Sequence, residues 1–322
     1  MRDGLERTID YLRVSVTDRC DLRCVYCMPE EGVKALDHGS LLSYEEIMRL
    51  ARIFASLGIK KIRLTGGEPL VRKDIHRLVA ELKSINGIKT VVMTTNGTLL
   101  EENLPELICA GLDGVNISID AIDEDVFRRI TRRSGVDRVR RSIEAAVASP
   151  GLRVKLNCVP TELNITQLVP LARFAGELGV PLRFIELMPI GEGKSLKCLR
   201  EAEVRSILTG AFGDLKPAQE NIDPREKCRY FVLPGGGKVG FISALSHRFC
   251  QYCDRVRLTA EGFLKTCLQY DRGLALKPLL GVSDEEIREE IIDAVRTKPA
   301  GHHFGSGSQA GDEKRIMSQI GG

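Results

Sequence analysis

From residue 11 to about residue 190, short stretches with alternating polar and apolar residues are interleaved with longer stretches of helical periodicity. The short stretches predict six strands, at residues 11–17, 59–65, 90–95, 114–119, 153–159 and 182–188. The longer ones predict helices at residues 44–57, 75–85, 102–110, 139–148 and 167–178. Strands that alternate with helices run parallel and are joined by helical crossovers. Six such units predict a partial or complete α/β barrel, with a doubly wound open sheet as the alternative.

One face is polar in several of these strands. Side chains two positions apart share a face of a strand. The polar faces carry Arg13, Ser15 and Thr17; Lys61, Arg63 and Thr65; Asn116, Ser118 and Asp120; and Arg153, Lys155 and Asn157. Because helices must cover the apolar faces, we expect the polar faces to point into the barrel. Cations in such an interior indicate an anionic ligand, although internal salt bridges explain any single residue equally well.

The pattern changes after about residue 190. A triglycine at Gly235-Gly236-Gly237 precedes a predicted strand at residues 238–242, and a helix is predicted at residues 284–296. We interpret this part as a C-terminal extension packed on the barrel. The predicted division is a barrel over residues 1–225 and an extension over residues 226–322 that contains the second cysteine group and ends in Gly-Gly.

Composition narrows the class of protein. The 322 residues are 43% hydrophobic, which is enough for a sizeable core. The net charge of only +3 lacks the global basic field that non-specific nucleic-acid binding needs. The N-terminus lacks the apolar stretch of a signal peptide, and no apolar run approaches the length of a membrane span. We therefore expect a soluble, cytoplasmic protein with no membrane and no stable nucleic-acid partner.

Six of the ten cysteines fall into two tight groups, Cys20, Cys24 and Cys27, then Cys250, Cys253 and Cys267. Disulfides are unexpected in a reducing cytosol, whereas thiolates bind zinc and iron–sulfur clusters. A structural zinc ion takes four ligands, and the first group has no local fourth. Three thiolates on a cubane cluster leave one iron open for a substrate or cosubstrate. The isolated Cys109, Cys158, Cys198 and Cys228 are predicted to be core or incidental residues.

The second group leaves two interpretations open. His247 could complete a zinc site with Cys250, Cys253 and Cys267, or the three thiolates could hold a second cluster with another open iron. Residues 254–259 alternate like a strand, so Arg255 and Arg257 share one face. That face is either solvated or a pair of guanidinium donors for phosphate beside the cluster.

The first cysteine group resembles the signature of the radical S-adenosylmethionine (SAM) superfamily, with its C-x3-C-x2-C spacing and an aromatic residue, Tyr26, before the last cysteine. Gly66-Gly67-Glu68-Pro69 resembles the SAM-binding motif of that superfamily, although such a motif alone could be an ordinary strand-to-helix turn. The resemblance implies a partial (β/α)6 radical SAM barrel. It also implies a 4Fe–4S cluster whose open iron binds SAM, which is then cleaved to a 5′-deoxyadenosyl radical.

Along nearly its whole length the chain resembles the GTP 3′,8-cyclase family of molybdenum-cofactor biosynthesis. The matching stretches are residues 13–29, 63–69, 94–97, 116–120, 184–191, 249–268 and 317–322. The resemblance implies that Cys20, Cys24 and Cys27 hold the SAM cluster, and that Cys250, Cys253 and Cys267 hold a second 4Fe–4S cluster that binds the guanine base. It implies SAM contacts from Tyr26, Gly67, Ser118 and Met188. It implies GTP contacts from Arg13, Arg63, Thr94, Lys155, Arg255 and Arg257, and a catalytic role for the tail residues Gly321 and Gly322.

The resemblance further implies a lyase that converts GTP to (8S)-3′,8-cyclo-7,8-dihydroguanosine 5′-triphosphate after abstraction of the ribose 3′ hydrogen. The implied partners are GTP, an external electron donor such as flavodoxin or ferredoxin, and a downstream cyclic pyranopterin monophosphate synthase. A homodimer is a possible assembly. Two alternatives are a peptide-maturing radical SAM enzyme with an auxiliary cluster and a non-catalytic iron–sulfur carrier or sensor. A zinc-bearing nucleic-acid module is disfavoured by the low net charge.

Overall fold

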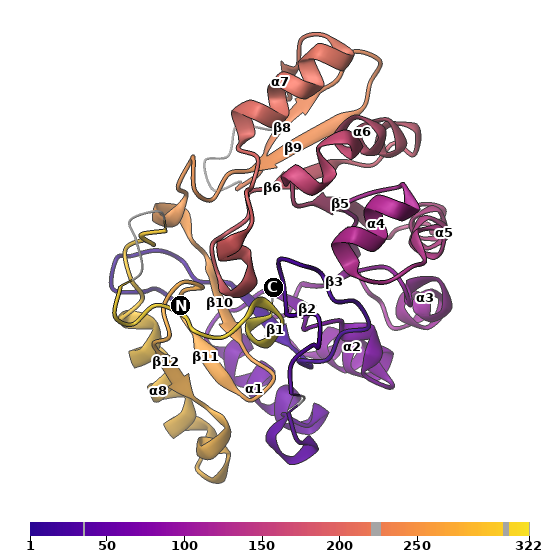
Figure 1. The fold of residues 1–322 in the computed structure, drawn as a ribbon. Coiled ribbons are helices and arrows are strands. Elements are labelled where there is room, and N and C mark those ends of the chain that lie inside the picture. The colour runs from indigo at the N-terminus through magenta and orange to yellow at the C-terminus, as the bar shows by residue number, and fades with distance from the viewer. Residues whose placement is uncertain (35, 220–226, 305–308, 322) are drawn as a thin grey trace.

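The computed structural model describes residues 1–34, 36–219, 227–304 and 309–321. Six parallel strands form the centre of the sheet in chain order: β1 (Tyr11–Ser15), β2 (Lys61–Thr65), β3 (Thr90–Thr95), β4 (Gly114–Ser118), β5 (Arg153–Cys158) and β6 (Leu182–Ile185). The strands curve into an arc with helices on its outer side (Figure 1). The predicted α/β fold with six β/α units is therefore confirmed, and the doubly wound open sheet is wrong because neighbours along the chain are neighbours in the sheet.

The predicted helices are present as α1 (Tyr44–Ser56), α2 (Ile75–Ser84), α3 (Leu100–Cys109), α5 (Val136–Val147) and α6 (Leu168–Glu177). The sequence pattern missed α4 (Glu124–Thr131), an eight-residue helix. Asp123 caps α4 by accepting a hydrogen bond from the Val126 amide at 3.0 Å. Helices this short depend on tertiary packing, so periodicity alone gives little signal for them.

The C-terminal part extends the sheet at both edges. The strand β10 (Arg255–Leu258) pairs in parallel with β1, and β9 (Lys238–Ile242) pairs in parallel with β6. Antiparallel strands follow on each side: β11 (Phe263–Lys265) and β12 (Gly273–Ala275) beyond β10, and β8 (Arg229–Val232) and β7 (Lys216–Pro217) beyond β9. The remaining helices are α7 (Glu201–Phe212), α8 (Asp284–Arg296) and α9 (Met317–Ile320). The extension thus continues the barrel wall; the predicted boundary at residue 225 lies outside the described residues.

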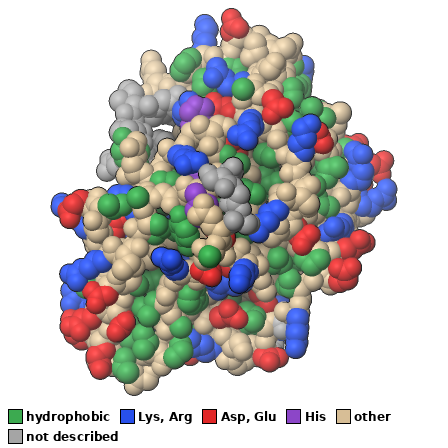
Figure 2. Space-filling model, turned by 60° about the vertical axis from the view of Figure 1, so that its left-hand side comes forward, with side chains coloured by type: hydrophobic (Ala, Val, Ile, Leu, Met, Phe, Trp, Pro, Cys, Tyr) green, Lys and Arg blue, Asp and Glu red, His purple; other side chains and the backbone are tan. Residues whose placement is uncertain are grey.

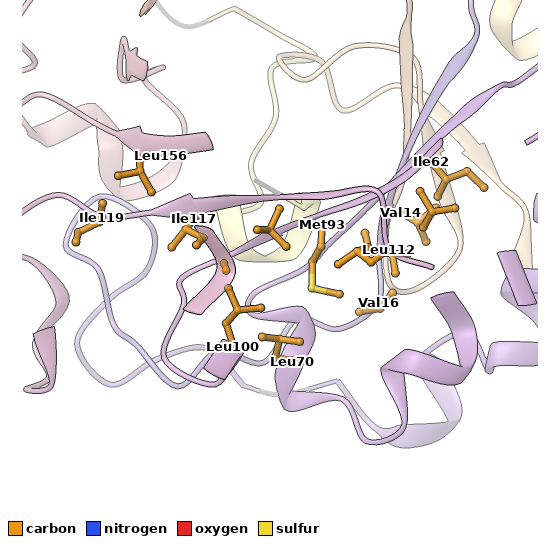
Figure 3. Close-up of a cluster of buried hydrophobic side chains, with 14 of the residues drawn as sticks. Val14, Val16, Ile62, Leu70, Met93, Leu100, Leu112, Ile117, Ile119 and Leu156 are labelled. Atoms are coloured by element: carbon orange, nitrogen blue, oxygen red, sulfur yellow. The ribbon is translucent and has the colours of Figure 1, made fainter. Parts of the chain in front are cut away.

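The core lies between the apolar strand faces and the helices. Figure 3 shows Val14, Ile62, Met93, Ile117 and Leu156, one from each of five neighbouring strands, in a continuous layer of buried side chains. Each such side chain stabilises the fold by about 1.5–3 kcal/mol when it is fully buried. Their burial leaves the alternate, polar residues of the same strands facing the barrel interior. In the part of the chain that the structure describes, no helix is both long and apolar enough to cross a membrane.

Candidate active site

A cavity of about 700 Å³ occupies the barrel interior. Its wall includes all six grouped cysteines and every residue predicted to contact SAM or GTP. These are Cys20, Cys24, Cys27, Cys250, Cys253 and Cys267; Tyr26, Gly67, Ser118 and Met188; and Arg13, Arg63, Thr94, Lys155, Arg255 and Arg257. Residues separated by more than 200 positions in the sequence therefore meet in one space.

The two cysteine groups lie at opposite ends of the parallel strands. Cys20 follows the carboxyl end of β1, whereas Cys253 precedes the amino end of β10. Since Tyr11 on β1 is in register with Arg255 on β10, the amino ends of the two strands lie at the same level. The polar strand faces between the two levels therefore connect one cysteine group to the other.

The first cysteine loop is held by backbone hydrogen bonds and by Asn96. The amides of Arg23 and Val25 donate to the carbonyls of Thr131 and Ile130, each at 2.9 Å. The Asn96 side chain donates to Asp21 Oδ1 at 2.8 Å and lies 3.8 Å from Cys20 Sγ. The motif Thr94-Thr95-Asn96-Gly97 thus supports the cysteine loop as well as contributing Thr94 to the cavity.

The thiols of this first group lie among carboxylates. Burial, with Glu68 and Asp21 nearby, raises the pKa of Cys20. Burial and Asp120 raise the pKa of Cys27 to about 12. Because thiolate is the form that binds metal, iron binding at this site must displace protons.

Glu68 and the two glycines before it have a structural role. A Cβ atom on Gly67 would lie 2.3 Å from the Arg19 carbonyl oxygen, so only glycine allows the loop before Cys20 to pack here. Glu68 accepts hydrogen bonds from Thr95 Oγ1 and the Asn96 amide, each at 2.7 Å. Burial raises the pKa of Glu68 to about 7. Backbone packing is therefore enough to require glycine at residue 67.

Tyr26 and Asp120 form a buried pair across the same end of the cavity. The Tyr26 hydroxyl donates to Asp120 Oδ2 at 2.5 Å, and Asp120 Oδ1 accepts from the Val159 amide at 2.7 Å. Burial raises the pKa of Asp120 despite these hydrogen bonds. The pair fixes the tyrosine hydroxyl at the wall of the cavity, which both residues line.

Cations form rows across the neighbouring strands β10, β1 and β2. One row is Arg257, Arg13 and Arg63, since Arg13 is in register with both of the others. Burial and the charge of Arg255 lower the pKa of Arg257 to about 10. Like charges side by side on a sheet repel. The repulsion between these arginines costs free energy, and a bound polyanion would offset that cost.

Tyr11 is a functional candidate that sequence reasoning missed. It lies in the next cross-strand row, between Arg255 and Lys61, with its ring centre 4.8 Å from Lys61 Nζ. Its hydroxyl accepts a hydrogen bond from Arg63 Nε. Burial raises its pKa, but Arg63, Arg13 and the other nearby cations outweigh burial and lower the pKa to about 7.

Three cations of the cavity wall lie outside both the predicted site residues and the predicted polar strand faces. Arg183 on β6 is 9% exposed and donates to Asn157 Oδ1 at 2.6 Å. Lys298 donates to the Arg255 carbonyl at 3.0 Å, and Lys227 forms an ion pair with Asp254. Lys227 and Lys298 come from irregular segments, so no strand pattern could have identified them.

The second cysteine group lies among cations. Arg7 donates to the Cys250 carbonyl at 2.8 Å. Burial raises the pKa of Cys253, but Lys298 and Arg255 outweigh it, so the pKa is lowered. His247, the alternative fourth zinc ligand, contacts Arg229 at 3.0 Å instead and is not part of the cavity wall.

The thiols of both groups suit iron–sulfur clusters as donors. Each group supplies three cysteines and lines the same cavity. Among the described residues, no three Cys, His, Asp or Glu side chains converge closely enough for a single metal ion. Three thiol donors facing an open space fit a cluster with one iron left for another ligand.

The C-terminal tail enters the barrel. Gly321 is buried, and its carbonyl accepts a hydrogen bond from Arg257 Nη1 at 2.6 Å. A Cβ atom on Gly321 would lie 2.8 Å from Thr65 Oγ1 and 3.0 Å from Ser15 Cβ, and its φ of +73° favours glycine. The tail is anchored upstream by a buried ion pair between Lys265 and Glu313. Gly322 lies outside the described residues.

The four isolated cysteines are dispersed. Cys158 and Cys228 are buried, Cys198 is half-buried, and Cys109 is exposed. Cys228 lines the cavity, whereas Cys158 packs against Asn164, whose side chain donates to its sulfur at 3.5 Å. The prediction that these residues are core or incidental agrees with their scattered positions.

Comparisons with known proteins fit this geometry. Residues 14–174 match the family described as Radical SAM superfamily, and residues 180–304 match Molybdenum Cofactor Synthesis C. The chain is 43% identical to a GTP 3′,8-cyclase of Syntrophomonas wolfei and 45% identical to one of Heliobacterium modesticaldum, each over the full length of both chains. In fold it is similar to Streptococcus suis SuiB bound to S-adenosylmethionine, with a TM-score of 0.64 at 16% identity, over 90% of this chain and 68% of SuiB.

Proposed function

This chain belongs to the GTP 3′,8-cyclase family of the radical SAM superfamily, and we propose that it converts GTP to (8S)-3′,8-cyclo-7,8-dihydroguanosine 5′-triphosphate. The reaction begins with abstraction of the ribose 3′ hydrogen, and the resulting carbon radical bonds to C8 of guanine. One observation carries the proposal: two three-cysteine groups lie at opposite ends of one cavity, with rows of arginine between them.

Cys20, Cys24 and Cys27 would hold the first 4Fe–4S cluster, which supplies the electron that cleaves bound SAM to a 5′-deoxyadenosyl radical. The chain's own residues position the reactants. Tyr26, Gly67, Ser118 and Met188 surround this end of the cavity and would contact SAM. Enclosure in the barrel excludes water, which protects a radical from side reactions.

GTP would span the distance between the two ends. Arg13, Arg63, Arg255 and Arg257 would bind the triphosphate, since guanidinium groups match phosphate oxygens in pairs. Arg63 Nη1 donates to Thr94 Oγ1 at 3.0 Å, so Thr94 fixes the orientation of that arginine. Lys155, whose ammonium lies 3.3 Å from Tyr230 Oη, adds a cation from the opposite side of the barrel.

The second group, Cys250, Cys253 and Cys267, would hold a second 4Fe–4S cluster whose open iron binds the guanine base. Holding the base at one end and the phosphates through arginines would place the ribose toward the SAM site. Such positioning contributes much of the rate when the reacting atoms are held close together. Gly321 would complete the cavity wall beside Arg257, and both tail residues, Gly321 and Gly322, would be needed for turnover.

The wider setting follows from this chemistry. The reducing cytoplasm would keep the ten cysteines free of disulfides. An external carrier such as flavodoxin or ferredoxin would supply the electron, and cyclic pyranopterin monophosphate synthase would take the product. A homodimer is a compatible assembly.

The test is anaerobic reconstitution with iron and sulfide, followed by incubation with SAM, dithionite and GTP. We expect two four-iron clusters per chain, 5′-deoxyadenosine and the cyclised nucleotide by mass spectrometry. Stoichiometric zinc without iron at Cys250, Cys253 and Cys267 would contradict the second cluster. Formation of 5′-deoxyadenosine without any change in GTP would contradict the substrate.

A further inference from the structure

A group of arginines borders the loop of the first cysteine group. Seven arginines lie between residues 128 and 141. Three of them pair with carboxylates: Arg128 with Asp125 at 2.8 Å, Arg140 with Asp137 at 3.5 Å, and Arg141 with Glu101 at 3.3 Å. The other four have no carboxylate partner among the described residues, and we call them the α4–α5 arginine patch: Arg129, Arg132, Arg133 and Arg138.

The carboxylates at the start of α4 are engaged elsewhere. Asp123 caps the helix, and Glu124 accepts hydrogen bonds from the amides of Gly135 and Val136 at 3.0 and 2.9 Å. Three members of the patch, Arg129, Arg133 and Arg138, are exposed. Between residues 123 and 141, therefore, the charges left for a partner are positive, whereas Glu30 and Glu31 of the neighbouring cysteine loop are exposed carboxylates.

The end of α4, beside the arginine patch, is hydrogen-bonded to the loop of the first cysteine group. The carbonyls of Ile130 and Thr131, at the end of α4, accept from the amides of Val25 and Arg23, each at 2.9 Å. Val25 lies between Cys24 and Cys27 in the sequence. No segment intervenes between the end of α4 and the loop that would hold the first cluster.

Arg132 links the two parts directly. Its Nη1 donates to the carbonyls of Arg23 and Met28 at 3.1 and 3.0 Å. Its backbone is left-handed, with φ of 55°, at the C-cap of α4, where glycine is the usual residue. A side chain there is strained, and such strain persists where the surrounding contacts impose it. The arginine side chain provides those contacts.

We propose that the α4–α5 arginine patch docks a small acidic flavin protein that delivers one electron to the first cysteine site. The inference rests on the proposed function, because only a redox centre at Cys20, Cys24 and Cys27 needs this electron. The reduced flavin loses one electron, and the SAM bond accepts it on cleavage. Electron transfer weakens steeply with distance, so a donor must dock beside the cluster loop. Complementary charge steers such short-lived encounters.

The test compares two double variants with the same change in net charge. Arg129→Glu/Arg133→Glu reverses the patch, and Arg52→Glu/Arg77→Glu reverses exposed arginines on α1 and α2. Formation of 5′-deoxyadenosine is measured with reduced flavodoxin and, separately, with dithionite, which needs no docking site. Binding of oxidised flavodoxin to each cluster-free protein is measured at low and high salt. Circular dichroism checks folding, with Arg129→Gln/Arg133→Gln as a milder pair.

We expect the patch variant to lose about tenfold or more in flavodoxin-driven rate and in flavodoxin affinity at low salt, with its dithionite-driven rate unchanged. The control variant should match the wild type in every assay. Equal losses with both reductants, or unchanged flavodoxin binding, would overturn the proposal. So would a patch that binds single-stranded RNA but leaves the flavodoxin-driven rate intact. A wild type that is inactive with dithionite would refute the proposed function instead, while flavodoxin binding would still decide whether the patch docks a carrier.

Discussion

The two cysteine groups offer the same three thiols, but Cys20 of the first lies near carboxylates, whereas Cys253 of the second lies near cations. At the first, burial together with Glu68 and Asp21 raises the pKa of Cys20. At the second, Lys298 and Arg255 overcome the effect of burial and lower the pKa of Cys253. Both ends offer three cysteine thiols, so the neighbouring charges decide which further molecule each end can bind.

The difference suits the two proposed ligands. SAM carries a sulfonium and an ammonium cation, which acidic surroundings favour. GTP is a polyanion, which the rows of arginine and lysine beside the second group favour. On the face of the molecule that Figure 2 shows, by contrast, basic and acidic side chains are mixed.

Removing one cysteine from each group should give the largest and most informative effects. We expect Cys24→Ala to abolish both 5′-deoxyadenosine and cyclised product, because SAM cleavage depends on the first site. Cys253→Ala should abolish cyclised product but leave substantial 5′-deoxyadenosine. Iron content and both products, measured under anaerobic conditions, check this expectation. If the two variants lost the same products, the two ends would not have separate roles.

Removing Gly321 and Gly322 should abolish cyclised product while folding, cluster content and SAM binding stay intact. Gly321 fills the space between Ser15, Thr65 and Arg257, and deletion would leave Arg257 without that carbonyl partner. Product is compared for truncated and full-length protein under identical conditions.

Gly321→Ala is a milder change at the same place, because it keeps the length of the tail. Its added methyl group would lie 2.8 Å from Thr65 Oγ1, so we expect a partial loss of the same kind. Undiminished product from the truncated protein would show that the tail is a terminus without function.

Arg257→Ala should weaken GTP binding by about 2 kcal/mol, or about 30-fold, with little effect on SAM. The loss should shrink for guanosine, which lacks the phosphates that the guanidinium would bind. Calorimetric titrations with GTP, guanosine and SAM measure the three affinities. Equal losses for GTP and guanosine would place the action of Arg257 elsewhere.

Lys155→Ala tests the opposite wall of the cavity. Lys155 lies on β5, near Tyr230, and we expect a similar selective loss of GTP affinity. The same three titrations apply. A larger loss of SAM affinity than of GTP affinity would instead assign Lys155 to the SAM end of the barrel.

Tyr11 should give the smallest effect, visible as pH dependence. Its pKa is lowered to about 7 in the folded protein, so the unfolded state binds more protons above that pH. Tyr11 should therefore add stability as pH rises from about 7 toward about 10, and this gain should disappear as pH falls through about 7. Urea unfolding of cluster-free wild type and Tyr11→Phe across this range measures the difference. If the free energies of unfolding of the two proteins changed with pH in parallel, the predicted contribution of Tyr11 would be wrong.

A bound polyanion should oppose the positive charges that lower the pKa of Tyr11. We expect GTP to raise the pKa of Tyr11, so that binding near pH 8 takes up a proton in the wild type but not in Tyr11→Phe. Binding heats in two buffers of different ionisation enthalpy report the uptake. A proton count that is the same in both proteins would assign the uptake to another group.

The sequence determined the order of the β/α units, the presence of two groups of three cysteines and which strand faces are polar. These features are local: side chains two apart share a strand face, and ligand spacing is a property of one loop. The predicted strands overlap the observed ones, with differences at their ends, such as residues 182–188 against Leu182–Ile185 for β6. Family resemblance added the individual site residues, all of which line the cavity apart from the tail.

Only the tertiary structure decided how these parts meet. Tyr11 was missed because an aromatic residue at the start of a strand shows no charge, and its environment comes from cations on β2 and β10. The pairing of β10 with β1 joins segments more than 200 residues apart, which no local pattern encodes. Gly67 is required by the Arg19 carbonyl in another loop, and Gly321 by Thr65 at the end of β2. Long-range packing, rather than local preference, therefore sets the charge at each end of the barrel.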